Sequence, residues 1–379
     1  MKRLVLAGTA FASLSGGVQA QSSVTLFGVV DLNVRYVRND AATWQLGQDG
    51  MAGSRLGFRG VEDLGSGLKA GFWLEAGLGP DTGRGNASFG NGTTSVTVPC
   101  PPGQTSGCPT VISNENAVLF QRRATVSLSN TWGELRLGRD YTPNFWSIAV
   151  YDPFGTNGVG SSGNLFVAAE IRGIVGAAGA YGTLVRANNS VQYILPNGIF
   201  GPGLYGNFMV AAGENAPANK YYGGRIGYAA GAFDAAAAYG YTYADAAGNV
   251  TAPHWNIGGS WNFGVAKLSG YYGSLQVDGL AAGDAKQDNW FVGITAPMAQ
   301  WNLKASYGRV KQSGNVLDGN SASQAAIGVD YNVSLRTALY ATASWLGNDH
   351  TTYGVSATGS ALSRGNNSSG AEVGIRHSF

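Results

Sequence analysis

The sequence has no long hydrophobic run after its first twenty residues. A membrane-spanning helix needs about 20 consecutive apolar residues, so we do not expect the mature chain to cross a membrane with helices. Charged residues make up only 12% of the 379 positions, and Lys and Arg nearly balance Asp and Glu, at 24 against 22. A nucleic-acid-binding protein would be basic overall, so the composition argues against that class of function.

Sequence motifs of catalysis are also scarce. The three histidines, His254, His350 and His377, lie too far apart for a metal-binding spacing, and no Gly-Lys pair indicates a phosphate-binding loop. The pattern GxGxxG occurs at residues 158–163 and 201–206, but 59 glycines make chance matches common, and neither match lies in a βαβ context. We therefore expect no enzyme activity, no catalytic residue, no metal and no cofactor.

The first twenty residues have the pattern of a secretory signal peptide. Lys2 and Arg3 form a short positive region, a small and apolar stretch follows, and Val-Gln-Ala has the form of a cleavage site. The alternative, a transmembrane anchor, is disfavoured because the apolar stretch is short and rich in Gly and Ser. We predict a signal peptide over residues 1–20 and one mature domain over residues 21–379.

The chain has only two cysteines, Cys100 and Cys108, in a stretch rich in Pro, Gly and Thr. An exported protein meets an oxidising environment in which two such thiols can pair. Two free thiols are the alternative. We favour a disulfide that closes and stiffens a small loop.

Alternation of apolar and polar residues with a period of two runs through the mature sequence. It is clear in residues 254–263, 301–307 and 371–379. Such alternation is typical of β-strands with one apolar face and one polar face in contact with water. The last of these segments ends on Phe379. In a membrane such a strand must be paired, because hydrocarbon cannot satisfy open backbone groups.

Short and long connections alternate along the chain. Short turns are expected near residues 63–67, 130–133, 195–203, 229–233, 262–265, 296–300 and 331–334, and long polar stretches near residues 39–53, 78–117, 140–186, 213–220, 244–253, 277–288, 311–323 and 347–369. Seven short and eight long connections join about sixteen strands, with both ends of the chain on the short-turn side. One missed hairpin would give about fourteen or eighteen strands instead. The expected fold is all-β: a transmembrane, antiparallel, up-and-down β-barrel.

The longest stretch between predicted strands, residues 140–186, is the third long connection. A barrel of about sixteen strands has a lumen too wide for its own side chains to fill, so the lumen holds water. This stretch has the length to fold inward and narrow the pore. After Asp140 its carboxylates are Asp152 and Glu170, which we expect at the constriction.

Five sequence segments occur in an informative order: SSVTLFGVVD after the predicted signal peptide, SRLGFRGVEDLGSGLKAGF at 54–72, WGELRLGRDYTP at 132–143, NNSVQY at 188–193 and the terminal VGIRHSF. Together they resemble the general porins, the trimeric sixteen-stranded pores of Neisseria- and Burkholderia-type Gram-negative bacteria. The resemblance covers essentially the whole mature chain. It implies a place in the outer membrane, contact with outer-membrane lipid and lipopolysaccharide, a homotrimer, and recognition of Phe379 by the barrel-assembly machinery.

The resemblance also implies a basic cluster on the barrel wall that faces acids of the third loop. By motif position this cluster falls on Arg59, Arg122 and Arg186. Strand parity turns Arg55, Arg59 and Arg186 toward the lumen, whereas Arg122 shares the parity of residues expected to face lipid, a conflict that a β-bulge would resolve. The nearest match to the family's PEFG-like loop motif is Asp-Pro-Phe-Gly, in which Asp152 replaces Glu with a shorter side chain.

The expected function is a passive pore for small hydrophilic solutes and ions, in which pore radius and lining charge decide what passes. The mature chain is nearly neutral, so ion preference depends on charges within about one Debye length, roughly 8 Å at physiological salt. The arginines outnumber Asp152 and Glu170, which predicts a modest preference for anions. Two alternatives remain open: a substrate-specific porin, and a surface adhesin or receptor barrel.

Overall fold

The structure is a computed structural model of the whole chain. It describes residues 23–85, 94–97, 110–113, 119–166, 183–196, 198, 201–214, 217–281, 283–314 and 317–379. The predicted signal peptide, the cysteine pair Cys100 and Cys108, and Glu170 lie outside these described residues, so what the sequence indicates for them stays a prediction.

The described residues form twenty strands and two helices, whose bounds follow in chain order. They are β1 (Ser23–Arg38), β2 (Ala42–Gln48), β3 (Arg55–Gly65), β4 (Leu68–Gly79), β5 (Arg84–Gly85), β6 (Thr94–Thr97), β7 (Thr110–Ser113), β8 (Arg123–Asn130), β9 (Gly133–Tyr141), α1 (Pro143–Tyr151), α2 (Gly163–Phe166), β10 (Arg186–Ile194), β11 (Leu204–Ala211), β12 (Tyr221–Ala230), β13 (Phe233–Tyr243), β14 (Thr251–Asn262), β15 (Lys267–Val277), β16 (Ala285–Met298), β17 (Trp301–Ser313), β18 (Ser321–Asn332), β19 (Thr337–Asp349) and β20 (Ser368–Ser378). Among the described residues, no helix is long and apolar enough to cross a membrane.

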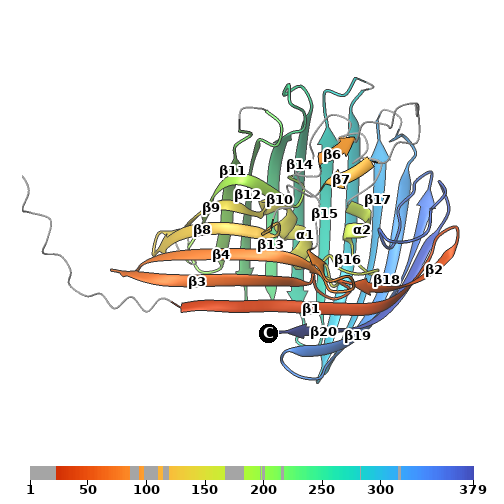
Figure 1. Cartoon of the computed structure of the whole chain (residues 1–379), viewed down its shortest axis with the longest axis horizontal. Coiled ribbons are helices and arrows are strands. Elements are labelled where there is room, and N and C mark those ends of the chain that lie inside the picture. The colour runs from red at the N-terminus through yellow and green to blue at the C-terminus, as the bar shows by residue number, and fades with distance from the viewer. Residues whose placement is uncertain are drawn as a thin grey trace, which may run out of the picture.

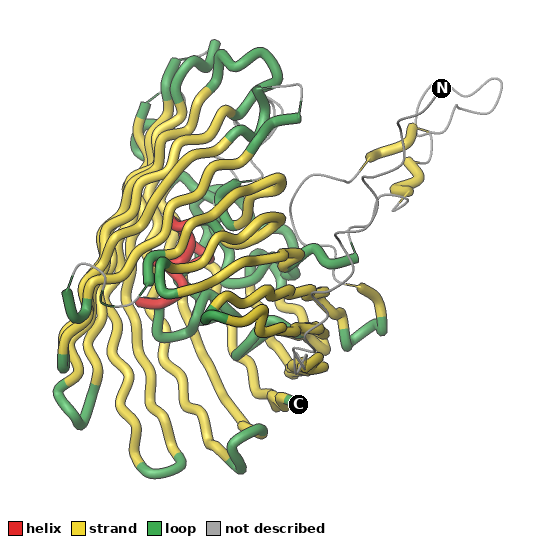
Figure 2. The backbone as a smooth tube through the Cα atoms, turned by 90° about the vertical axis from the view of Figure 1, so that its left-hand side faces the viewer, coloured by secondary structure: helices red, strands yellow, loops and turns green. Residues whose placement is uncertain are grey.

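The strands close into an antiparallel barrel (Figures 1 and 2). The last strand, β20, pairs with the first, β1, from Val29↔Ser378 to Arg38↔Ser369. Strands β2 and β3 pair with different halves of β1, so together they act as one interrupted strand. With that pair counted once and the two-residue β5 left aside, the described residues form a barrel wall of 16 strands. The predicted fold class and strand number are confirmed.

The first connection differs from the one that the sequence suggested. We expected one long polar stretch over residues 39–53, but β2 lies within it and pairs with β1 across a tight turn. Trp44 and Leu46 of β2 face outward and are 73% and 58% exposed. The period of two was therefore present in this segment, but its polar composition and short length hid it.

The chain leaves the barrel wall at residues 49–54, between β2 and β3. The buried carboxylate of Asp31 faces inward from β1 and accepts three backbone hydrogen bonds there, at 2.7–3.3 Å, from Gly50, Met51 and Ala52. A carboxylate that accepts several backbone N–H groups is strongly anchored. Asp31 therefore holds this segment against the inner wall.

The two faces of the wall differ in chemistry. On β1, the side chain of Val34 faces outward and is 54% exposed, while Asn33 and Arg35 face inward and are buried. Aromatic pairs lie at both ends of the outward apolar band: Trp301 and Tyr331 near the short turns, with ring centroids 4.6 Å apart, and Tyr36 and Trp44 near the long loops, with centroids 5.0 Å apart. An apolar band between two aromatic girdles is typical of outer-membrane barrels.

The described part of the third long connection lies along the inner face of the wall (Figure 2). Helix α1 packs against β12, β13 and β14, and α2 packs against β17 and β18. The side-chain amide of Asn144 donates to the His254 carbonyl at 2.8 Å, and its oxygen accepts from the Tyr221 hydroxyl at 2.9 Å. These inward-facing wall residues fix α1 inside the barrel.

Candidate functional site

Within the described ranges, three arginines and one carboxylate meet on the inner wall formed by β3, β4, β8, β9 and β10. Arg122 Nε lies 2.6 Å from Glu75 Oε1, and Arg55 Nε lies 3.8 Å from the same oxygen. Arg186 adjoins them, because its Nε donates to the Arg122 carbonyl at 2.7 Å and its Nη2 to the Tyr141 hydroxyl at 2.6 Å. We term these five residues, Arg55, Glu75, Arg122, Tyr141 and Arg186, the arginine cluster.

Strand register explains how the cluster forms. Glu75 on β4 lies opposite Gly57 on β3 and Arg123 on β8, so its side chain faces the lumen beside a residue without a side chain. Arg122 precedes β8, which begins at Arg123, and its backbone N–H donates to the Glu75 carbonyl at 3.1 Å. The alternation of the strand does not constrain a residue outside it. Arg122 and Arg123 can therefore both face inward, which removes the parity conflict.

Arg59 occupies a separate place on the wall. It lies four residues from Arg55 on β3, or about 13 Å along the strand toward the short-turn end. Its guanidinium lies over the rings of Phe27 and Trp73, at 5.5 and 5.3 Å from their centroids. The Arg123 guanidinium lies 4.6 Å from the same Trp73 ring. Arg59 makes no ion pair with the arginine cluster in the described part of the chain, and it adjoins the cluster through Trp73, whose indole N–H donates to Glu75 Oε2 at 3.1 Å.

Asp152 lies at the C-terminal end of α1 and turns into its own loop. Its carboxylate accepts backbone hydrogen bonds from Phe154, Thr156 and Ser162 at 2.9–3.0 Å, and one from the Ser162 hydroxyl at 2.6 Å. Burial raises the pKa of Asp152, and the donors of Ser162 and of the loop backbone oppose that rise. The sequence suggested an acid that opposes the wall arginines. These contacts instead make Asp152 a brace for the turn that follows α1.

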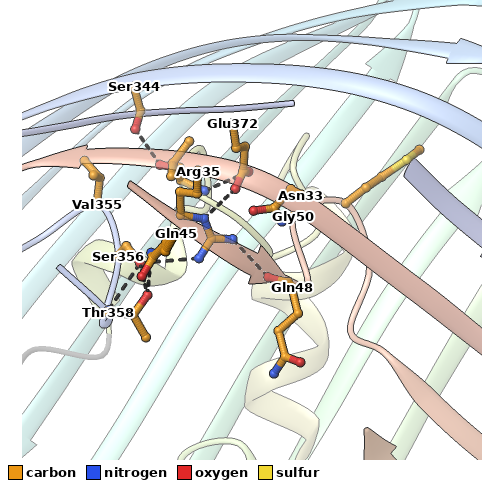
Figure 3. Close-up of polar contacts among 12 residues, drawn as sticks. Asn33, Arg35, Gln45, Gln48, Gly50, Ser344, Val355, Ser356, Thr358 and Glu372 are labelled. Atoms are coloured by element: carbon orange, nitrogen blue, oxygen red, sulfur yellow. Dashed lines mark hydrogen bonds and ion pairs between the residues drawn. The ribbon is translucent and has the colours of Figure 1, made fainter. Parts of the chain in front are cut away.

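A further ion pair joins β1 to β20, the first and last strands of the barrel, and its carboxylate also contacts the third long connection (Figure 3). Arg35 Nε lies 2.8 Å from Glu372 Oε2, and Arg35 Nη2 donates to the Gln48 carbonyl at 2.9 Å. The other carboxylate oxygen of Glu372 accepts from the backbone N–H of Val159 at 3.0 Å. Sequence reasoning missed this contact. The signal was present, since Arg35 and Glu372 have lumen parity on the first and last strands, which must pair in a closed barrel.

The carboxylates of the inner wall have defined partners. Pairs with N–O distances of 2.6–2.9 Å are Glu75 with Arg122, Asp140 with Arg136, Asp330 with Lys304, and Glu372 with Arg35. Asp234 accepts hydrogen bonds from the hydroxyls of Tyr205 and Tyr151. In the described part of the chain, Arg59 and Arg186 form no ion pair. Asp49 also attracts Arg55 and Arg122. With Asp49 counted beside Glu75, the three arginines still outnumber the nearby carboxylates, so the arginine cluster keeps an excess of positive charge. The described residues hold no group of three or more His, Cys, Asp or Glu that could bind a metal.

A closed membrane barrel with a charged inner wall and an internal loop defines a pore protein. The chain belongs to the Gram-negative porin family, whose sequence profile it matches over residues 7–351. This confirms the family that the sequence segments indicated, and it places the protein in the bacterial outer membrane.

Individual relatives agree with this assignment. The chain is 37% identical to outer membrane porin protein 32 of Delftia acidovorans, over the full length of both chains. The solved anion-selective porin from Comamonas acidovorans has 33% identity and a TM-score of 0.78, and the match covers 95% of this chain and 100% of that one. The trimer form of OmpT from Vibrio cholerae shares the fold, with 15% identity, a TM-score of 0.62 and coverage of 94% and 99%.

Proposed function

We propose that this porin passes small hydrophilic solutes and ions passively, with a modest preference for anions that is set at the arginine cluster. The observation that carries the proposal is the sharing of one carboxylate, Glu75, by Arg55 and Arg122, with Arg186 beside them. Arginine linings favour anions in pores. The relationship to the anion-selective porin from Comamonas acidovorans supports the same conclusion.

The contacts of the cluster describe how it would act on a passing ion. Arg186 is fixed between the Tyr141 hydroxyl and the Arg122 carbonyl, so its charge keeps one position. Arg55 has a weaker ion pair, with 3.8 Å to Glu75, and can meet a solute. Fixed charges act over about 8 Å at physiological salt. A chloride or carboxylate that enters this zone exchanges part of its hydration for guanidinium contacts, while a cation is repelled.

Single-channel recording in planar bilayers, with about 0.1 M KCl opposed to about 0.5 M, tests this proposal. The wild type should show a zero-current potential of the anion-preferring sign. Arg55→Ser should shift it toward cation preference, and Glu75→Gln should shift it further toward anions, because the two changes remove opposite charges from one site. Arg336→Ser, at the exposed turn after β18, is the matched control and should leave the potential within error. A cation-preferring wild type, or equal shifts from Arg55→Ser and Arg336→Ser, would refute the proposal.

We further propose a homotrimer in contact with outer-membrane lipid and lipopolysaccharide, inserted by the barrel-assembly machinery through recognition of Phe379. The small residues of the wall support close packing of copies, since they let surfaces approach in lipid. Unheated detergent gels should show a band at three times the monomer mass, and a monodisperse monomer in mild detergent would contradict the trimer.

The disulfide between Cys100 and Cys108 is also part of the proposal. Thiol labelling of the non-reduced, denatured protein should detect no free thiol, and labelling after reduction should detect both. Serine at both positions should leave barrel assembly intact.

A further inference from the structure

The lipid-facing wall carries an apolar groove over β15–β19, on the strands that stand side by side in Figure 1. Its volume is about 680 Å³. Register explains its shape, because Ala325 lies between Tyr307 and Trp345 on the neighbouring strands. Ala305 lies likewise between larger outward residues, Ile294 and Ile327. Small residues form the floor and large ones the sides, so the groove matches an extended hydrocarbon chain.

A second pocket, of about 580 Å³, lies on the same strands toward the long loops. On β17 the outward row that includes Tyr307 of the groove continues as Arg309 and Lys311 of this pocket. On β16 the outward row continues from Val292 of the groove to Trp290 of the pocket. The two hollows therefore follow one another along the outer face, the first apolar and the second polar.

The charge in the polar pocket is positive where the pocket adjoins the groove. Asp288 is paired with Lys286 at 2.9 Å, and Asp349 contacts His350 at 2.8 Å. Arg309 contacts the Ser321 hydroxyl at 3.4 Å. Neither Arg309 nor Lys311, both exposed, forms an ion pair within the described ranges. Asp288 lies opposite Lys311 in the strand register, but its carboxylate is paired with Lys286. Lys286, Arg309 and Lys311 together therefore outnumber the two carboxylates, and the outer face keeps a net positive charge there.

The height of these cations places them at the boundary of the membrane. Trp301, in the short-turn girdle, and Arg309 are eight residues apart on β17, or about 26 Å along the strand. With the usual tilt of about 40°, that is roughly 20 Å of height, against an apolar band about 25 Å tall. Lys311, two residues further along, reaches roughly 25 Å, the edge of the apolar band on the loop side, which faces the outside of the cell. Arg309 lies about 5 Å below that edge, and its long side chain can extend to the head-group level.

We propose that the groove and the polar pocket form one binding site for a phosphorylated glycolipid of the outer leaflet. One acyl chain occupies the groove over Ala305 and Ala325, and a phosphate lies between Arg309 and Lys311. The ring of Trp290 borders the junction between chain and head group, as aromatic residues do at membrane interfaces. The inference deepens the lipid contact proposed above and rests on it, but it is independent of the ion preference of the pore.

The charge half of the site is tested with purified, delipidated porin and bisphosphorylated lipid A, titrated by native mass spectrometry. Arg309→Ala/Lys311→Ala should weaken binding about 30-fold, from the usual contribution of a basic residue beside an anionic lipid surface. Lys267→Ala/Arg336→Ala removes two basic residues at the short-turn end and should leave binding within about threefold of the wild type. Equal binding by the wild type and the Arg309/Lys311 variant would overturn the site. No binding of lipid A by the wild type would instead refute the lipid contact itself.

The groove half is tested with Ala325→Leu, which fills the space between Tyr307 and Trp345 without adding charge. It should weaken lipid A binding about tenfold, while Ala237→Leu, at an exposed outward position on β13, should not. Wild-type binding of phosphatidylglycerol as tight as that of lipid A would overturn the assignment to a glycolipid. The Arg309/Lys311, Ala325→Leu and Ala237→Leu variants should keep wild-type conductance and selectivity, since these side chains face lipid, and a changed conductance would overturn that placement.

Discussion

Arg55 and Arg59 face the same lumen from one strand but differ in what surrounds them. Arg55 shares Glu75 with Arg122, while Arg59 lies over aromatic rings about 13 Å away along β3. This backbone spacing exceeds the Debye length of roughly 8 Å at physiological salt, so the charge of Arg59 is screened from Glu75 more strongly than that of Arg55. Arg59→Ser should therefore shift the zero-current potential toward cations by less than Arg55→Ser does, when both are measured at about 0.15 M mean salt. A larger shift from Arg59→Ser would place the selective zone at the rings of Phe27 and Trp73.

Asp40, in the turn between β1 and β2, ties this turn to the loop before β20. Its carboxylate accepts hydrogen bonds from the backbone and hydroxyl of Ser363 at 2.8 and 2.5 Å and from the amide of Asn366 at 2.7 Å. The Ser363 and Asn366 side chains lower the pKa of Asp40 from its usual value of 3.8. A carboxyl with a lowered pKa stabilises the fold above its usual pKa, and this contribution is lost as the pH falls through the lowered value.

The consequence is a pH-dependent effect of one substitution. Asp40→Asn should increase hydrogen exchange of the backbone over residues 356–366 at pH 7, where the carboxylate is ionised. The difference from the wild type should shrink as the pH falls below the usual aspartate pKa of 3.8 and the wild-type carboxyl becomes protonated. Asp63→Asn, at the short-turn end of β3, should have no effect on this loop. A difference that stays the same at both pH values would show that Asp40 does not act through its charge.

The site residues divide into those that period-two patterning can place and those that it cannot. The patterning predicted that Arg55 and Arg186 face the lumen, and the structure places both side chains on the inner wall. The patterning failed for Arg122, because that residue lies one position before β8 begins, and strand starts are hard to locate from sequence. The family resemblance, and not the patterning, set Asp152 against the wall arginines, whereas its described partners lie in its own loop, because the geometry of a turn decides which backbone N–H groups reach a carboxylate. Distance in space, and not parity, separates Arg59 from the cluster.

At the scale of elements, the packing of α1 depends on a glycine in the wall. A Cβ at Gly258 on β14 would lie 2.3 Å from the Tyr151 ring of α1, so a larger residue must push the helix inward. Gly258→Val should therefore reduce single-channel conductance and increase current noise, because α1 moves into the lumen. Gly270→Val, where the nearest atom to an added Cβ is 3.8 Å away on the lipid-facing side, is the control. Unchanged conductance in Gly258→Val would mean that α1 does not border the conducting path.

The elements themselves were largely predictable. The seven short turns expected from the sequence agree with the observed strand ends within a few residues, as between Asn332 and Thr337 or between Ala230 and Phe233. Short turns need residues such as Gly, Asn and Pro at fixed places, so the sequence marks them. The break between β2 and β3 was not predictable, because the Asp31 carboxylate on another strand holds it. Contacts between distant segments leave no local signal.

At the scale of the whole molecule, closure of the barrel depends on a contact between its two ends. Gly28 on β1 donates to the Phe379 carbonyl at 3.0 Å, and Phe379 donates to the Gly28 carbonyl at 3.1 Å. A Cβ at position 28 would lie 2.3 Å from Cζ of the Phe379 ring. The ring therefore covers a strand position that must lack a side chain. An edge left unpaired at this seam would be costly in lipid.

This contact predicts a specific loss and a specific rescue. Gly28→Val should destabilise the folded barrel by about 1–3 kcal/mol, the usual cost of overpacking, measured by urea titration of the heat-modifiable form in micelles. Adding Phe379→Ala should restore part of the loss, because the ring that clashes with the valine is then absent. The restoration should be incomplete, since the Arg55 carbonyl would also lie 2.8 Å from the new Cβ. If the double variant is as unstable as the sum of the single ones, the ring of Phe379 does not determine the fit at the seam, and backbone pairing alone closes the barrel.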